Sequence, residues 1–171
     1  MTNLVRVYVP ATVPLVASLQ GGPELKLPAA SAHAVTPALR EWYTEGDQEE
    51  LEYLAFTRAA QEALRLLHDD PAAPRRRVVV SADVAPQAVH AESQELGTSA
   101  VRLSMPVTLS AIASFHIDAA EAEAEVTAAA QVVELAGAGD DEAQFVVDST
   151  EDHDLLWYAP EELGEMLRTQ A

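Results

Sequence analysis

Hydrophobic and polar residues alternate in the first stretch of the chain. Residues 4–10, LVRVYVP, place three valines on one side and Arg6 and Tyr8 on the other, which is the period of a half-buried strand. Pro10 is expected to end this strand, and a short helix capped by Thr12 follows it. Other apolar stretches predict strands at 31–35, 75–84, 100–106, 114–118, 144–148 and 154–159. The strand at 75–84 carries a continuous apolar run and is expected to be central.

Capping residues followed by apolar positions at spacings of three and four predict the helices. Asp47, with Glu50 three residues on, forms a capping box ahead of the longest helix, 48–68. Asp118 takes the same place ahead of a helix at 119–136. Shorter helices that begin at a proline are expected at 36–43 and 160–169.

Two stretches of the chain resemble one another. VRVYVPATVPLVAS (5–18) and VRLSMPVTLSAIAS (101–114) share six of fourteen residues. Each leads to a short strand, an alanine-rich helix and a strand that ends at Ala-Pro. This order predicts two β-α-β-α-β repeats, about 4–89 and 100–163, related by a pseudo-twofold axis within a single domain, 1–171. Strand–helix–strand connections favour parallel pairing, so the expected fold is α/β, a mixed sheet covered by helices. An α+β layout with helices on one face is the alternative.

Composition excludes several classes of function. The chain has 171 residues, no cysteine, 28 acidic residues and 10 lysines and arginines, for a net charge of −18. Disulfides, thiolate nucleophiles and zinc–cysteine sites are therefore excluded. So acidic a surface repels phosphate backbones, so we expect no nucleic-acid partner. The charge is interpreted as serving solubility, with attraction to a basic partner or to cations as the alternative.

The amino-terminal stretch does not resemble a membrane segment. Its apolar run is broken by Arg6, Pro10 and Pro14 and has no preceding basic region, so it predicts strand and helix rather than a signal peptide. We therefore expect no membrane association and a cytoplasmic protein.

One set of residues could hold a metal. His116 and Asp118 share one face of their predicted strand, and with His153 or Asp154 they would offer two imidazoles and a carboxylate. The alternative is that His116 is a strand residue, Asp118 a helix cap and His153 part of an acidic turn before a core strand. No cofactor is predicted. The one cofactor that these residues could bind is a divalent metal ion.

A second candidate follows from the repeat. Arg6 and Arg102 occupy equivalent positions, and across a pseudo-twofold axis their guanidinium groups could clamp an anion or a carboxylate. The alternative is that each neutralises a nearby acidic side chain. The chain contains no phosphate-binding glycine motif and no G-x-S-x-G elbow, so no known catalytic motif supplies a starting point.

The stretches VRVYVPATVP, HAVTPALREWY, RRRVVVSADV and EDHDLLWYAPEEL resemble an uncharacterised family of small acidic actinobacterial proteins of unknown function. The resemblance implies a cytoplasmic bacterial protein and carries over no activity. The absence of catalytic motifs favours a non-catalytic binding or regulatory module, forming a homodimer or contacting a protein partner. A small metal-dependent hydrolase that uses His116, Asp118, His153 and Asp154 is the alternative.

Overall fold

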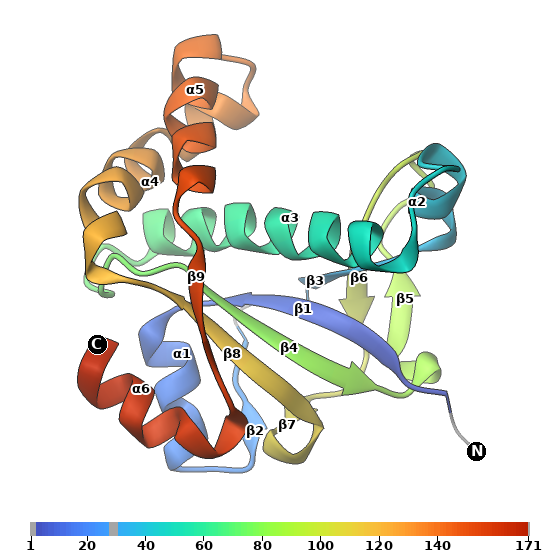
Figure 1. The fold of residues 1–171 in the computed structure, drawn as a ribbon, viewed down its shortest axis with the longest axis horizontal. Coiled ribbons are helices and arrows are strands. Elements are labelled where there is room, and N and C mark those ends of the chain that lie inside the picture. The colour runs from blue at the N-terminus through green and yellow to red at the C-terminus, as the bar shows by residue number, and fades with distance from the viewer. Residues whose placement is uncertain (1–2, 28–30, 171) are drawn as a thin grey trace.

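The computed structural model describes residues 3–27 and 31–170, and residues 1–2, 28–30 and 171 of the predicted domain lie outside the described residues. A seven-stranded sheet with the order β5-β6-β3-β1-β4-β8-β9 runs through the molecule (Figure 1). The strands are β1 (Val5–Ala11), β2 (Glu24–Leu25), β3 (Ser31–Ala34), β4 (Val78–Val84), β5 (Val89–Ala91), β6 (Ala100–Leu103), β7 (Val107–Thr108), β8 (Ile112–Asp118) and β9 (Leu155–Tyr158). The two short strands β2 and β7 pair separately.

The helices begin largely where capping residues predict. Thr36 accepts a hydrogen bond from the Leu39 amide, and Asp47 accepts one from the Glu50 amide, which fixes the starts of α2 and α3. The helices are α1 (Val13–Ala17), α2 (Pro37–Trp42), α3 (Gln48–Asp69), α4 (Glu123–Gly137), α5 (Asp141–Ser149) and α6 (Leu163–Gln170).

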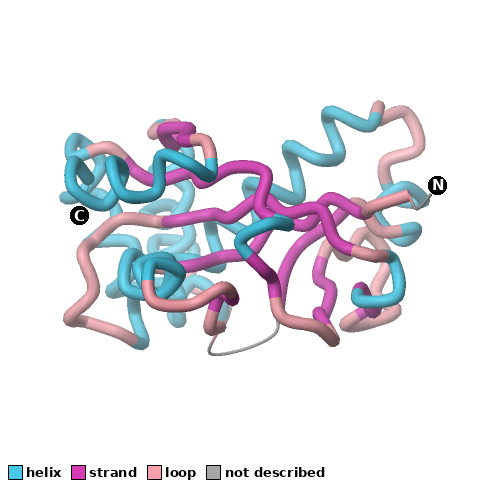
Figure 2. The backbone as a smooth tube through the Cα atoms, turned by 90° about the horizontal axis from the view of Figure 1, so that it is seen from below, coloured by secondary structure: helices cyan, strands magenta, loops and turns pink. Residues whose placement is uncertain are grey.

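Helices cover both faces of the sheet (Figure 1). On one face Val7, Val78 and Phe115 pack with α1 and α6 in the largest apolar cluster. On the other face Tyr8 and Val79 pack against alanines of α3. Figure 2 shows the strands running through the middle of the molecule with helices around them. The predicted α/β fold, a sheet covered by helices, is confirmed.

A second apolar cluster joins the end of α3 to α4 and α5. Leu64 and Leu67 of α3 are fully buried against Val126, Ala129 and Ala130 of α4. These α4 positions recur at three and four, as the predicted helix stripe requires. The α4–α5 pair extends away from the sheet, over the end of α3 (Figure 1).

The predicted strand at 144–148 is wrong, because these residues belong to α5. Asp140 is the N-cap of α5, and its carboxylate accepts a hydrogen bond from the Ala143 amide at 2.8 Å. Ala143 and Val147, four residues apart, form the buried side. The apolar run FVV is as short as a strand, so only the cap and the four-residue spacing distinguish a helix here.

The strand pairing does not confirm the duplication. The repeat predicts equivalent positions for β1 and β6, yet β1 lies between β3 and β4 whereas β6 lies between β5 and β3. Every pair among the described strands is antiparallel, so the expected parallel neighbours are not found. The similarity of 5–18 and 101–114 therefore does not correspond to equivalent places in the sheet.

Two strand details also differ from prediction. Pro10 lies within β1, opposite Val79 of β4, and does not end the strand. Among the described residues the register of β3 with β1 covers Val7 and Tyr8, and no pairing of Pro10 with β3 is found there. A strand side without a neighbour tolerates the missing N–H of proline. The predicted core strand at 154–159 is instead the edge strand β9, with Trp157 61% exposed.

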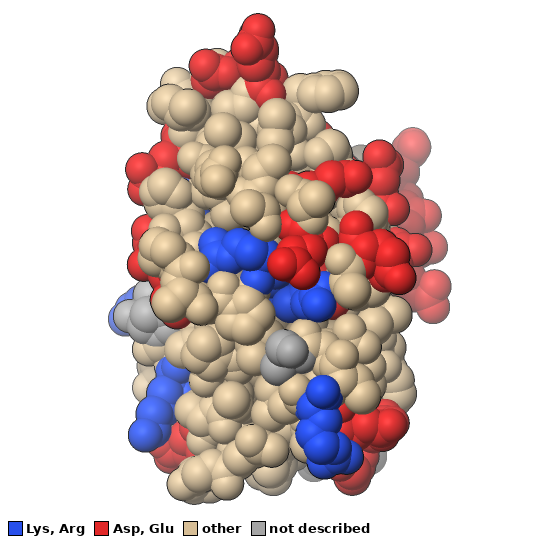
Figure 3. All heavy atoms as spheres, turned by 90° about the vertical axis from the view of Figure 1, so that its left-hand side faces the viewer, with Lys and Arg blue, Asp and Glu red and all other residues tan. Residues whose placement is uncertain are grey.

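Acidic side chains outnumber basic ones in the chain, 28 to 10. On the face shown in Figure 3 they stand out at the top, around α4 and α5, while a smaller group of basic side chains lies near the centre. Among the described residues no helix is both long and apolar enough to cross a membrane.

Candidate functional site

A cleft of about 490 Å³ lies between α3 and the sheet. Strands β1, β4 and β8 contribute its floor, and α3, β9 and the 3₁₀ turn η5 (Thr150–Asp152) contribute its walls. The volume falls within the range of small-molecule sites, about 300–1,000 Å³. The cleft is therefore the candidate functional site.

The floor of the cleft is polar because of strand alternation. In β4, Val78 and Val80 point to the large apolar core, so Ser81 points to the α3 side. Ser81 lies opposite Ser114 of β8, and His116 follows Ser114 on the same face. Three neighbouring polar side chains thus meet on the side of the sheet that faces α3.

His116 is the centre of this floor. Its Nε2 atom lies 2.9 Å from Ser114 Oγ and 3.2 Å from Ser81 Oγ. The Phe56 ring of α3 packs edge-to-face on the imidazole, with centroids 4.8 Å apart. Burial, assisted by the charge of Arg6, lowers the pKa of His116 from 6.5 to about 4, so the imidazole is neutral near pH 7. Within the described residues no hydrogen bond to Nδ1 is found, and His116 lines the cleft.

The low pKa of His116 makes stability depend on pH. Below about pH 6.5 the unfolded chain takes up a proton at His116 that the folded chain takes up only near pH 4. The contribution of neutral His116 to the unfolding free energy is therefore complete above pH 6.5 and is lost as the pH falls towards 4. When the pH is lowered from 7 to 5, the unfolding free energy of both proteins is measured by urea unfolding. We expect the decrease in His116→Gln to be smaller than the decrease in wild type by on the order of 2 kcal/mol. An NMR titration of His116 with a midpoint near 6.5 in the folded protein would contradict this expectation.

Ionisable groups of β1 line the cleft next to this floor. The Tyr8 hydroxyl donates to Glu52 of α3 at 3.4 Å, and burial together with the Glu52 charge raises the pKa of Tyr8 to about 12. Arg6 donates two hydrogen bonds to Asp83, at 2.6 and 3.0 Å. The bond to Asp83 is the main cause that raises the pKa of Arg6. The phenol stays protonated and the guanidinium stays charged and paired.

A buried ion pair anchors the turn that forms one wall. Arg77, 3% exposed, donates to both carboxylate oxygens of Asp118, 0% exposed, at 2.8 and 2.7 Å. The same guanidinium donates to the backbone carbonyls of Thr150 and His153. Arg77 therefore holds the start of β4, the end of β8 and the turn η5 together. The predicted cap role of Asp118 is wrong, because α4 begins at Glu123 and its N-cap is Ala122, which makes no side-chain hydrogen bond.

The four residues suggested as metal ligands have different surroundings. His116, His153 and Asp154 line the cleft, whereas Asp118 is occupied by Arg77. The Nε2 atom of His153 lies 2.8 Å from Glu125 of α4. No three of the four bring ligand atoms within 4.8 Å of one another, although all four lie within the described residues.

The two arginines of the suggested clamp lie apart. Arg6 is on β1 and paired with Asp83, whereas Arg102 is an exposed residue of β6, and β3 lies between these strands. Arg102 is opposite Ser31, and Arg6 is opposite Asp83 on the other side of β1. The structure does not bring the two guanidinium groups face to face.

The distance between Ser114 and His116 is that of a catalytic nucleophile and its general base, but the pKa and the hydrogen bonds of His116 do not suit a general base. A general base works best with a pKa near the operating pH, and that of His116 is about 4. A catalytic imidazole is also oriented by a hydrogen-bond partner on its other nitrogen, and among the described side chains no hydrogen bond to Nδ1 is found. The arrangement suits hydrogen bonding to a ligand better than proton transfer.

Sequence reasoning identified His116, His153 and Asp154 but missed Tyr8, Ser81, Ser114 and Phe56. The signal for the serines was present, since each interrupts an apolar run, in VVVSADV and in IASFHID. That they meet follows only from the neighbouring places of β4 and β8.

The fold and cleft define an antiparallel α/β protein with a ligand-sized cleft under its longest helix. The chain belongs to the family of unknown function DUF6912, whose family model matches residues 5–167. The predicted membership of an uncharacterised family is thereby confirmed, while the actinobacterial origin stays a prediction. No curated protein and no solved structure matches the chain.

Proposed function

We propose that the protein is a non-catalytic module that binds a small organic ligand in the cleft between α3 and the sheet. The observation that carries the proposal is the polar floor. Ser81 and Ser114 are 2% and 5% exposed, and His116 stays neutral beside them. Burying polar side chains costs free energy, so packing alone favours apolar residues at these positions. A ligand that hydrogen-bonds to the floor gives these polar residues a function.

The lining supports a planar ligand that is uncharged or cationic. Tyr53, Phe56 and Trp157 supply aromatic surface. The acidic side chains in the lining include Glu151 and Asp154, for which no ion pair is found among the described residues. The two arginines of the lining, in contrast, are paired with Asp83 and Asp118. Aromatic faces and free carboxylates favour cations, and the Nδ1 atom of His116 offers a further hydrogen bond.

The two tryptophans provide a direct test. Trp157 lines the cleft and is 61% exposed, whereas Trp42 does not line it and is 57% exposed. We would add indole, quinoline, purine and benzamidine fragments to ¹⁵N-labelled protein and follow the two indole N–H signals by NMR. A fragment that binds in the cleft is expected to shift the Trp157 signal and leave the Trp42 signal in place.

The matched variants complete the test. Trp157→Ala is expected to weaken fragment binding about tenfold, and Trp42→Ala to leave it unchanged. If no fragment shifts the Trp157 signal, or if binding survives Trp157→Ala, the proposal fails.

The proposal includes a cytoplasmic location, as the sequence leads us to expect. A homodimer or a protein partner stays a prediction, which gel filtration of the free and the fragment-bound protein would test. The metal-dependent hydrolase is not proposed further, because the four residues it needs do not converge.

A further inference from the structure

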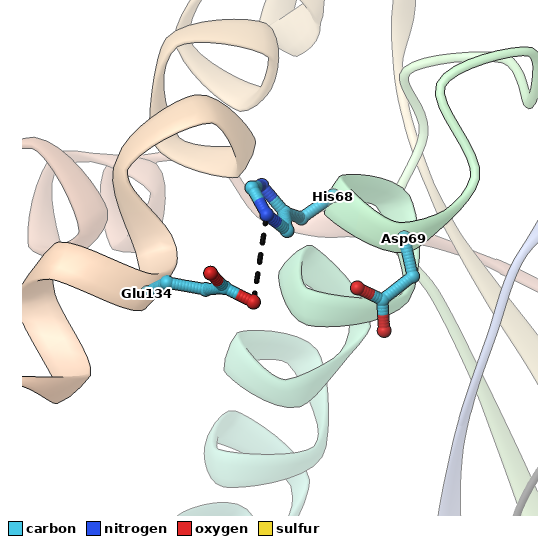
Figure 4. Close-up of side chains that lie close together, drawn as sticks. All are labelled: His68, Asp69 and Glu134. Atoms are coloured by element: carbon cyan, nitrogen blue, oxygen red, sulfur yellow. Dashed lines mark ion pairs between the residues drawn. The ribbon is translucent and has the colours of Figure 1, made fainter.

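We propose that His68, Asp69 and Glu134 bind a divalent transition-metal ion of the zinc type, at the contact between α3 and α4. This site lies outside the cleft, uses none of the metal ligands suggested by the sequence, and does not depend on the proposed function. The ligand atoms of the three side chains all lie within 4.8 Å of one another. His68 and Asp69 project from the last turn of α3, and Glu134 reaches the same place from α4 (Figure 4).

The orientation of the His68 ring is the first argument. Its Nδ1 atom donates to the backbone carbonyl of Ala130 at 2.9 Å. A neutral imidazole that donates from Nδ1 keeps its lone pair on Nε2. Histidines that ligate metals are oriented in this way, by a hydrogen bond from the other ring nitrogen to a carbonyl or carboxylate. The Nε2 atom of His68 faces the carboxylate of Glu134 (Figure 4).

The separation of the two facing atoms is the second argument. His68 Nε2 and Glu134 Oε1 are 3.5 Å apart, beyond the usual 2.7–3.2 Å of an N–H···O hydrogen bond. Two ligands of a tetrahedral ion with bonds of about 2.1 Å lie about 3.4 Å apart. The 3.5 Å separation of the two atoms therefore matches that of two ligands of one tetrahedral ion.

The other histidine–glutamate pairs of the described chain show the contrast. His33 and Glu62 are 2.6 Å apart, and His153 and Glu125 are 2.8 Å apart. Both distances are those of direct hydrogen bonds. The His68 pair alone combines a wider separation with a third ligand nearby, Asp69.

The chemistry of the donors sets the choice of ion. One imidazole and two carboxylates suit Zn²⁺ or Co²⁺, whereas Mg²⁺ prefers oxygen ligands and retains its waters. The side chain of His68 is 32% exposed and that of Glu134 61%, so water can reach the fourth position. The bound ion would join the end of α3 to α4 across the apolar cluster formed by Leu67 and Ala130.

Isothermal titration calorimetry of untagged protein with ZnCl₂ and with MgCl₂ tests the site. Wild type is expected to bind one Zn²⁺ and to show no comparable binding of Mg²⁺. Removing a residue that only hydrogen-bonds to a metal ligand lowers metal affinity about 10–100-fold. Removing a ligand itself, in His68→Ala or Glu134→Gln, is therefore expected to raise the zinc Kd at least about tenfold.

Glu134→Gln replaces an exposed side chain with one of the same size, so this variant is expected to fold. It therefore tests the site even if His68→Ala does not fold. The matched control is His90→Ala, which removes an exposed histidine of β5, the edge strand at the other end of the sheet from β9. The control is expected to bind zinc as wild type does. A zinc Kd unchanged in both site variants, or a loss in His90→Ala equal to theirs, would overturn the proposal.

Discussion

Replacing Asp118 with alanine is expected to lower the free energy of unfolding by about 3–5 kcal/mol. The reason is that Arg77, only 3% exposed, would keep its charge without the carboxylate that balances it. The backbone amide of Arg77 would also lose its acceptor, Asp118 Oδ2 at 2.8 Å. Urea unfolding followed by circular dichroism measures the difference.

The chain contains a matched control in its second bidentate arginine–aspartate pair. Arg6 and Asp83 are 38% and 35% exposed, so water solvates both charges. Asp83→Ala is therefore expected to cost no more than about 1 kcal/mol. The double variant Arg77→Met/Asp118→Leu, which removes both buried charges, is expected to recover much of the loss. Equal losses in Asp118→Ala and Asp83→Ala would show that burial of the pair does not control its contribution.

Replacing Phe115 with alanine is expected to cost about 3–5 kcal/mol of unfolding free energy. Phe115 is 0% exposed on β8 and packs in the cluster that holds α1 and α6 to the sheet. Removal of its ring leaves a cavity that the paired strands on either side cannot close. The measurement is again the midpoint and slope of urea unfolding.

Phe145→Ala provides the comparison for the same side-chain change. Phe145 is 75% exposed on α5, so its loss is expected to alter stability by about 0.5 kcal/mol or less. The comparison also tests the helical assignment of residues 141–149, since a buried strand at 144–148 would make Phe145 costly to remove. Similar losses in the two variants would contradict the structure in this region.

Local signals made much of the fold predictable. Asp47 and Glu50 sit at the start of a strongly periodic segment, and α3 begins and ends within a residue of the prediction. The apolar run 78–80 marked a central strand, and β4 lies between β1 and β8. Where a signal was short, as in FVV of α5, periodicity could not separate helix from strand.

Long-range pairing was not predictable from these patterns. The order of the strands sets which polar residues meet, and Ser81 and Ser114 meet only because β4 lies beside β8. The partner of Asp118 is 41 residues away in the chain, so its spacing suggested a helix cap instead. His116 and His153, which were named as candidate metal ligands, both line the cleft, although no sequence pattern places them near one another.

The central place of β1 has a consequence for how the chain is made. In the finished sheet Val5 lies opposite Val84, and Ser31 lies opposite Arg102. As the chain is synthesised, β1 is therefore complete before its partner β3 and well before its other partner β4. Closing such long loops costs conformational entropy before contacts repay it, which slows folding. Until β4 is made, β1 can pair only with β3 and pack against α1 and α3, so its face towards the largest apolar cluster is completed late.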